Sequence, residues 1–186
     1  MSVEPVRHLF TVEEYERMGE AGLFDDGPRV ELVGGEIVEM SPIGRRHAAC
    51  VNRLNALLTR ALGEQFIVAV QNPMRLDDLS EPQPDLVVLK PRTDFYAAFH
   101  PRPEDTLLVI EVAETSLGWD RGIKRARYAA AGVAEVWIVD LGAGMVEVAT
   151  EPGPSGYAQV RRLGPAEPIE ASVVPGLTCT VASIIG

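Results

Sequence analysis

Residues 106–140, TLLVIEVAETSLGWDRGIKRARYAAAGVAEVWIVD, determine the fold class of this chain. Leu107–Val112 and the segment EVWIVD are continuous apolar runs with the length of buried strands. Between them, Asp120 is positioned to cap a helix, RGIKRARYAAA, that ends at Gly132. A strand, a helix and a strand joined by short links predict a right-handed parallel crossover. The expected fold class is therefore α/β, with a mixed sheet and helices on its faces.

The segments before this unit predict a helix, a hairpin and a second helix. Thr11 and Glu14 form a capping-box pattern at the start of a short helix that stops near Gly22. The two glycines of RVELVGGEIVEM favour a tight turn, which predicts a hairpin over Arg29–Met40. GRRHAACVNRLNALLTRALGE predicts a long amphipathic helix that ends at Gly63. Its apolar residues, spaced three and four apart, are Val51, Leu54, Leu58, Ala61 and Leu62.

The remaining segments add strands, a loop and a second hairpin. FIVAVQNPMRL predicts a strand bent near Pro73, and DLVVL predicts a buried strand that begins just after Pro84. Lys90–Asp105 is interrupted by prolines and is expected to hold one helical turn, near Tyr96. Residues 142–186 predict a peripheral hairpin around a Pro/Gly turn, followed by a tail that packs back on the core. A chain of 186 residues, 46% of them hydrophobic, is expected to form one domain.

Composition excludes several classes of protein. No apolar run approaches the ~18 residues that span a bilayer, and the N-terminus lacks the apolar core of a signal peptide, so we expect a cytoplasmic protein. Cys50 and Cys179 are far apart, which argues against a zinc ribbon or a disulfide framework. The formal charge of -10 repels nucleic acid on average. Carboxylates of a cation site would contribute to that charge, and Arg45 and Arg46 are still able to contact phosphates.

Two acids next to apolar strands are the candidate chemical groups. Asp85 precedes the strand Leu86–Leu89, and Glu111 lies near the end of the strand Leu107–Val112. If these strands pair antiparallel, the start of one lies beside the end of the other, and the two carboxylates converge. Partly buried carboxylates repel each other unless a cation keeps them ionised, and hard oxygen ligands suit Mg²⁺ or Mn²⁺.

A lysine is expected close to these acids. Asp120, Lys124 and Tyr128 are spaced four apart on the helix that follows Glu111, so they share one face. A metal ion polarises a phosphoryl oxygen and lowers the pKa of a bound water, while a lysine stabilises developing negative charge. The combination is suited to the hydrolysis of phosphodiester bonds.

Four motifs follow one another along the chain: Pro84-Asp85, Glu111-Val112-Ala113, DRGIK with the Tyr128 that follows, and GVAEVWIVD. Taken in order, they resemble the motifs of the Uma-type putative restriction endonuclease family, a branch of the PD-(D/E)XK nuclease superfamily. The resemblance extends from the ELVGGEIVEM hairpin to the closing VPGL. The ordered set is more specific than any single motif, because a Pro-Asp dipeptide occurs by chance in many proteins.

The resemblance implies a fold and a division of the chain. It implies a restriction-endonuclease-like mixed sheet flanked by helices, with peripheral hairpins, as a single domain over residues 1–186. The nuclease-like core would span 43–141, preceded by the N-terminal helix and hairpin at 9–40. The C-terminal hairpin and tail would follow at 142–186.

The resemblance also implies the site. Asp85 and Glu111 would bind the metal, Mg²⁺ or Mn²⁺, with the Val112 carbonyl as a further ligand. Ala113 stands where the superfamily motif has a lysine. Either Lys124 supplies that ammonium from the neighbouring helix or catalysis is lost, and the sequence favours the first.

Structural roles are the alternative for both acids. Asp85 is also suited to a turn in which it binds local amides after the proline. Glu111 is also suited to a buried ion pair with a nearby arginine, Arg121 or Arg125. Because an acid inside an apolar strand is costly without a partner, we favour a functional role for Glu111.

Further candidates carry weaker signals. His47, at the start of the long helix, is placed to hydrogen-bond near the site or contact phosphate, although a packed histidine is the more common case. Glu31 and Glu36 flank the hairpin turn, and either is a candidate extra acid for the metal. Lys124 and Asp120 would alternatively form a solvated pair on the helix surface.

Three functions remain open at this point. The leading hypothesis is a divalent-metal-dependent endonuclease that hydrolyses DNA, as a homodimer by analogy with restriction enzymes. The alternative is a catalytically inactive nuclease fold retained as a DNA-binding or interaction module, for which the displaced lysine and the acidic charge are the evidence. The third is a metal-dependent hydrolase of a small phosphate ester.

Overall fold

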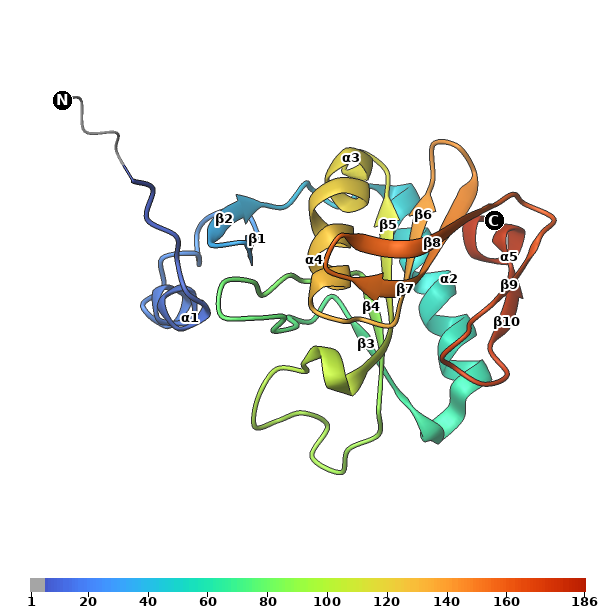
Figure 1. Ribbon diagram of the computed structural model, residues 1–186, viewed down its shortest axis with the longest axis horizontal. Coiled ribbons are helices and arrows are strands. Elements are labelled where there is room, and N and C mark those ends of the chain that lie inside the picture. The colour runs from blue at the N-terminus through green and yellow to red at the C-terminus, as the bar shows by residue number, and fades with distance from the viewer. Residues whose placement is uncertain (1–5) are drawn as a thin grey trace.

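A six-stranded mixed sheet runs through the centre of the computed structural model, which describes residues 6–186 (Figure 1). In the order in which they pair, its strands are β3 (Ile67–Val70), β4 (Leu86–Leu89), β5 (Thr106–Ala113), β6 (Glu135–Asp140), β7 (Met145–Gly153) and β8 (Gly156–Leu163). β5 and β6 pair parallel, and the other neighbours in this sheet pair antiparallel. The predicted mixed α/β sheet is confirmed.

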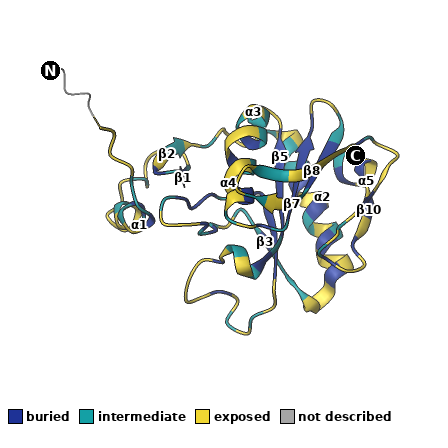
Figure 2. Ribbon diagram, viewed as in Figure 1, coloured by how far each residue is buried: buried dark blue, intermediate teal, exposed yellow. Residues whose placement is uncertain are grey.

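Helices cover both faces of the sheet, so the central strands are buried on both sides (Figures 1 and 2). One face is covered by α2 (Arg45–Leu62), after which η1 (Gly63–Gln65) follows in an exposed turn, and by α5 (Val181–Ile185). The other face is covered by α3 (Leu117–Trp119), η3 (Asp120–Lys124) and α4 (Arg125–Ala130). Along β4, Leu86 and Val88 pack with the α2 side, whereas Val87 and Leu89 pack with Tyr128. Burial on both faces explains why the strand is apolar throughout. Within residues 6–186, no helix has the length and apolar character that a bilayer crossing requires.

The crossover between β5 and β6 begins earlier than the sequence predicts. Helical structure starts at Leu117, and Asp120 lies inside it instead of capping it. The hydroxyl of Ser116 donates to Asp120 Oδ2 at 2.6 Å, so the predicted N-cap is wrong. Asp120–Lys124 form a π-helical turn, a widened turn that often occurs at functional sites. The helix ends before Gly132, whose φ of 84° suits glycine.

The N-terminal part matches its sequence signals. α1 (Val12–Glu20) begins at Thr11, which forms the predicted capping box with Glu14. β1 (Val30–Val33) and β2 (Glu36–Glu39) form the predicted hairpin. Its two turn glycines have φ angles of 63° and 80°, which glycine adopts without steric cost.

The C-terminal hairpin is not peripheral. β7 pairs with β6 along its length, so β7 and β8 continue the central sheet. This pairing satisfies the backbone groups of β6 that would otherwise form an open edge. β9 (Pro168–Glu170) and β10 (Thr178–Thr180) form a small separate sheet. Val181 and Ile184 pack into the core beside α2, which confirms that the tail lies back on the core.

Two loop predictions are wrong in detail. β3 ends before Pro73 because Gln71 adopts a left-handed φ of 52°. The helical turn lies at η2 (Pro103–Asp105) instead of near Tyr96. Phe95 and Tyr96 have φ angles of 49° and 62°, which no right-handed helix contains.

Candidate active site

Strand pairing brings the two predicted acids to one place. β4 and β5 pair antiparallel with Leu86 opposite Ile110, so Asp85 lies beside the end of β5 that carries Glu111. Asp85 Oδ2 accepts a hydrogen bond from the backbone N–H of Val112 at 2.9 Å. Both carboxylates line one open cleft of about 430 Å³. Asp85 therefore does not bind local turn amides, because its backbone donor lies on the neighbouring strand.

Two polar side chains hold Asp85 in place. His47 Nε2, from the first turn of α2, lies 3.0 Å from Asp85 Oδ2, and Gln71 Nε2 donates to Oδ1 at 3.1 Å. Burial by itself raises the pKa of Asp85, but the contacts with His47, Val112 and Gln71 lower it below its ordinary value. Asp85 is therefore a carboxylate at neutral pH, ready to act as a ligand.

Glu111 is buried on β5, with an exposed fraction of 3%. Lys124 Nζ lies 2.8 Å from Glu111 Oε1, and the hydroxyl of Tyr128 donates to the same oxygen at 2.6 Å. The predicted arginine partners bind other acids: Arg121 pairs with Asp140, and Arg121 and Arg125 both pair with Glu147. The partner of Glu111 is thus the lysine of the following helix, as the sequence predicts.

Lys124 connects Glu111 to the hairpin. Its Nζ lies 3.2 Å from Glu31 Oε2, and the same oxygen accepts the backbone N–H of Gln83 at 3.0 Å. Lys124 is 4% exposed, so the solvated surface pair with Asp120 does not occur. The widened turn of η3 directs Asp120 and Lys124 toward the interior.

The cleft carries more acids than bases. Asp85, Glu111, Asp120 and Glu31 all line it and are buried, whereas Lys124 is its one buried ammonium within residues 6–186. Burial raises the pKa of Glu111 to about 8, helped by the neighbouring acids and opposed by Lys124. Burial also raises the pKa of Asp120. A bound cation would favour the ionised forms of these carboxylates and oppose the effect of burial.

Glu36 does not belong to this cleft. It is exposed near the hairpin turn and pairs with Arg7 at 3.4 Å. Val33 lies opposite Glu36 and Glu31 opposite Val38, so both glutamates project from the same face of the hairpin. Glu36 misses the cleft because it lies next to the turn, whereas Glu31 lies at the open end.

Gln71 and Ser116 are polar partners that sequence reasoning missed. Gln71 follows β3, and Val70 pairs with Leu86, so Gln71 adjoins Asp85. Its backbone N–H donates to the Asp85 carbonyl at 3.0 Å. A polar residue directly after an apolar strand was the available signal, but only the β3–β4 register makes it specific.

The residues of the cleft fit a hard divalent cation. Mg²⁺ keeps several waters and takes one or two protein carboxylates, which matches Asp85 and Glu111 at the cleft wall. In residues 6–186 these acids do not form a set of three His, Cys, Asp or Glu ligands within 4.8 Å of one another. The cleft is therefore less suited to a closed zinc site, which requires three or four such ligands close together.

Comparison with known proteins agrees with this architecture. The family model Uma2, described as "Putative restriction endonuclease", matches residues 12–182. A solved structure, described as a putative nuclease belonging to DUF820 from Anabaena variabilis ATCC 29413, shares the fold with a TM-score of 0.71 and 14% sequence identity. The similarity covers 97% of this chain and 98% of that chain. No curated protein matches the chain. Because the family match spans nearly the whole sequence, the chain belongs to the Uma2 family, which is described as "Putative restriction endonuclease".

Proposed function

We propose that this protein is a divalent-metal-dependent endonuclease that hydrolyses phosphodiester bonds in DNA. Asp85 and Glu111 would hold Mg²⁺ or Mn²⁺, with the Val112 carbonyl as a further ligand, and Lys124 would lie beside the scissile phosphate. The family match supports nuclease activity as the class of function. The metal, the DNA substrate and these residue roles are our proposal.

The observation that carries the proposal is the convergence of Asp85, Glu111 and Lys124 in one cleft. Three different elements supply these residues: the start of β4, the end of β5 and the π-helical turn. A structural ion pair would need Glu111 and Lys124 alone. Asp85 adds an ionised carboxylate that has no role in that pair.

Each residue of the candidate site would make its own contribution to the hydrolysis. When bound, the metal ion would polarise the phosphoryl oxygen and lower the pKa of a water molecule. His47 and Gln71 would orient the Asp85 carboxylate, and Tyr128 would orient Glu111. The Lys124 ammonium, whose pKa is raised by the neighbouring carboxylates despite burial, would stabilise negative charge on the phosphate.

Binding of DNA by this acidic chain needs a local basic contact. Arg45 and Arg46 begin α2, next to His47 at the cleft wall. The Arg46 guanidinium donates a hydrogen bond to the Leu141 carbonyl at 2.6 Å. Arg45 is exposed and forms no ion pair within residues 6–186. Arg45 is therefore the better candidate for a phosphate contact.

The test is cleavage of plasmid and oligonucleotide DNA by metal-free protein supplied with Mg²⁺ or Mn²⁺. We expect cleavage that EDTA abolishes and that Asp85→Asn and Glu111→Gln lower by ~100-fold or more. Glu36→Gln is the control, because it removes the charge of an acid in the β1–β2 hairpin that lies outside the cleft. Circular dichroism of each variant separates loss of activity from loss of folding.

A protein silent on every DNA, with calorimetry showing no Mg²⁺ or Mn²⁺ binding, would refute the proposal and favour the inactive binding module. Metal binding with cleavage only of small phosphate esters would favour the third hypothesis. By analogy with restriction enzymes we also propose a homodimer, which sedimentation of the purified chain tests directly.

A further inference from the structure

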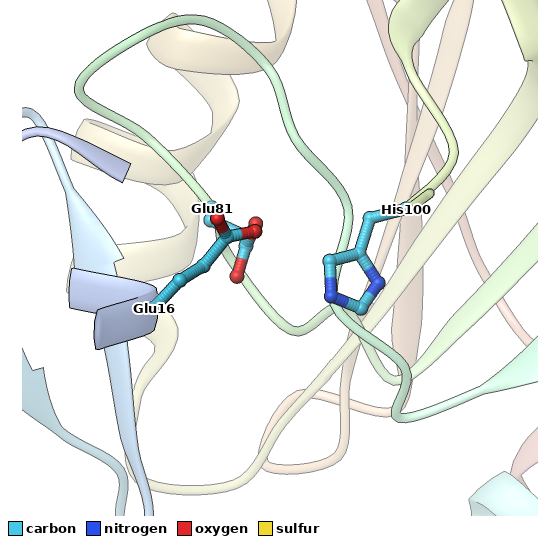
Figure 3. Close-up of side chains that lie close together, drawn as sticks. All are labelled: Glu16, Glu81 and His100. Carbon is cyan, nitrogen blue, oxygen red and sulfur yellow. The ribbon is translucent and has the colours of Figure 1, made fainter. Parts of the chain in front are cut away.

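A second group of metal-binding side chains lies away from the cleft. Glu16 comes from α1, Glu81 from the segment before β4, and His100 from the loop between β4 and β5. One ligand atom from each lies within 4.8 Å of the others. Figure 3 shows the two carboxylates next to each other and the imidazole directed toward them. No residue of this group lines the candidate active site.

Glu81 is the unusual member of the group. Its exposed fraction is 3%, and its Oε2 is buried without a hydrogen-bond partner in residues 6–186. The backbone of Glu81 is fixed, because its N–H donates to the Leu32 carbonyl of β1 at 2.8 Å. A buried carboxylate oxygen without a partner costs free energy, so its position calls for a ligand.

The nearby bases do not satisfy this carboxylate. Arg75 pairs with Glu13 and Asp78, and within residues 6–186 it forms no ion pair with Glu81. His100 likewise forms no ion pair with Glu16 or Glu81 among those found within residues 6–186. The two carboxylates cannot hydrogen-bond each other while both are ionised, whereas the three ligand atoms lie close enough to share one ion.

We propose that Glu16, Glu81 and His100 form a second cation site, which binds a divalent transition metal such as Zn²⁺. One imidazole with two carboxylates is a donor set that zinc accepts, whereas Mg²⁺ and Ca²⁺ prefer oxygen ligands alone. Zinc lies about 2.0–2.2 Å from such ligands, so the side chains must close slightly around it. Glu16 and His100 reach solvent and have room to make that movement, while Glu81 stays fixed.

The site would tie together segments that are distant in sequence. α1 and the loop between β4 and β5, which carries His100, both lie outside the central sheet, as Figure 1 shows. Burial, followed by the charge of Glu16, raises the pKa of Glu81 to about 7. A shared metal ion would remove the repulsion between the two carboxylates and link α1 to that loop.

The test is calorimetric titration of the metal-free full chain with Zn²⁺ alone. The Asp85→Asn variant serves as background, so that zinc bound at the candidate active site is not counted. We expect one Zn²⁺ site that Glu81→Gln and His100→Ala each weaken by ~10-fold or more. Glu20→Gln, at the end of the same helix, and His8→Ala are matched controls and should bind as the background protein does.

A thermal melt gives an independent readout. Zinc at ~100 times the Kd of the background protein should raise its Tm by about 5–10 °C, and at the same concentration it should raise the Tm of Glu81→Gln by about half as much or less. Glu81→Gln keeps the side-chain volume and removes a buried charge, so it is expected to fold. Zinc affinity equal to that of the background in either Glu81→Gln or His100→Ala would overturn the site, as would absence of zinc binding.

Discussion

Replacing Lys124 by methionine tests the electrostatics of the cleft most directly. The ammonium is 4% exposed and lies 2.8 Å from Glu111 and 3.2 Å from Glu31. Methionine fills similar space but leaves both carboxylates buried without their shared cation. Lys124→Met should therefore lower the free energy of unfolding, even though it removes a costly buried charge.

The size of the loss follows from this burial. Breaking a buried ion pair by removing one partner typically costs about 3–5 kcal/mol. For a chain of 186 residues, a Tm decrease of about 6–20 °C corresponds to that loss. Because the pKa of Glu111 is already about 8, part of the uncompensated charge is removed by protonation at pH 7. The lower end of the range is expected at pH 7.

The pH dependence has a definite sign. Without Lys124, the pKa of Glu111 rises further above its unfolded value, so the folded state holds a proton that the unfolded state has lost. Stability then falls as pH rises through this interval. The cost of Lys124→Met should thus be larger at pH 9 than at pH 7.

Urea unfolding of four proteins at both pH values measures the effect: the wild type, Lys124→Met, Glu111→Gln and the double variant. Metal-free buffer keeps added cations from replacing the lysine. The double variant should recover stability relative to Lys124→Met, with a coupling energy of ~2 kcal/mol or more. A Lys124→Met protein within ~1 kcal/mol of the wild type at both pH values would refute the reasoning.

Four further predictions concern the surrounding structure. Tyr128→Phe removes the hydroxyl that donates to Glu111 and should cost about 1–2 kcal/mol in urea unfolding; an unchanged midpoint would contradict this contact. Glu147 is buried, accepts hydrogen bonds from Arg125 and Arg162 and forms an ion pair with Arg121, so Glu147→Gln should cost about 2–3 kcal/mol, against less than ~0.5 kcal/mol for the exposed Glu170→Gln. Leu54 is fully buried on α2, and Leu54→Ala should cost about 2–5 kcal/mol by thermal or urea unfolding. Burial raises the pKa of the Cys50 thiol to about 11, so a thiol reagent at pH 8 should leave Cys50 unmodified in the folded protein and label it fully in urea.

Local patterns in the sequence predict most of the elements. The capping box at Thr11 and the paired glycines at 34–35 form the expected helix start and turn, because each depends on neighbouring residues alone. The predictions that the structure corrects are mostly those in which a residue distant in sequence determines the local structure. The 142–163 hairpin joins the central sheet because β7 pairs with β6, and the sequence of the hairpin itself does not indicate this pairing.

The candidate site was predictable in part. The placement of Asp85 before one buried strand and Glu111 near the end of another predicts their convergence once antiparallel pairing is assumed. The spacing of Lys124 and Tyr128 predicts that they share one helix face, and in the structure both contact Glu111. Gln71 was not predictable, because its role depends on the register between β3 and β4.

By itself, the sequence determined the α/β class and the strand–helix–strand unit, and it indicated Asp85, Glu111 and Lys124 as candidate site residues. Those features follow from periodicity and short-range spacing. The tertiary structure alone decided that Glu31 and not Glu36 faces Lys124, and that Glu16, Glu81 and His100 meet. Burial and long-range contacts decide these outcomes. Glu31 and Glu36, for example, lie on the same face of one hairpin, and only the packing of that hairpin brings Glu31 into the cleft and leaves Glu36 exposed.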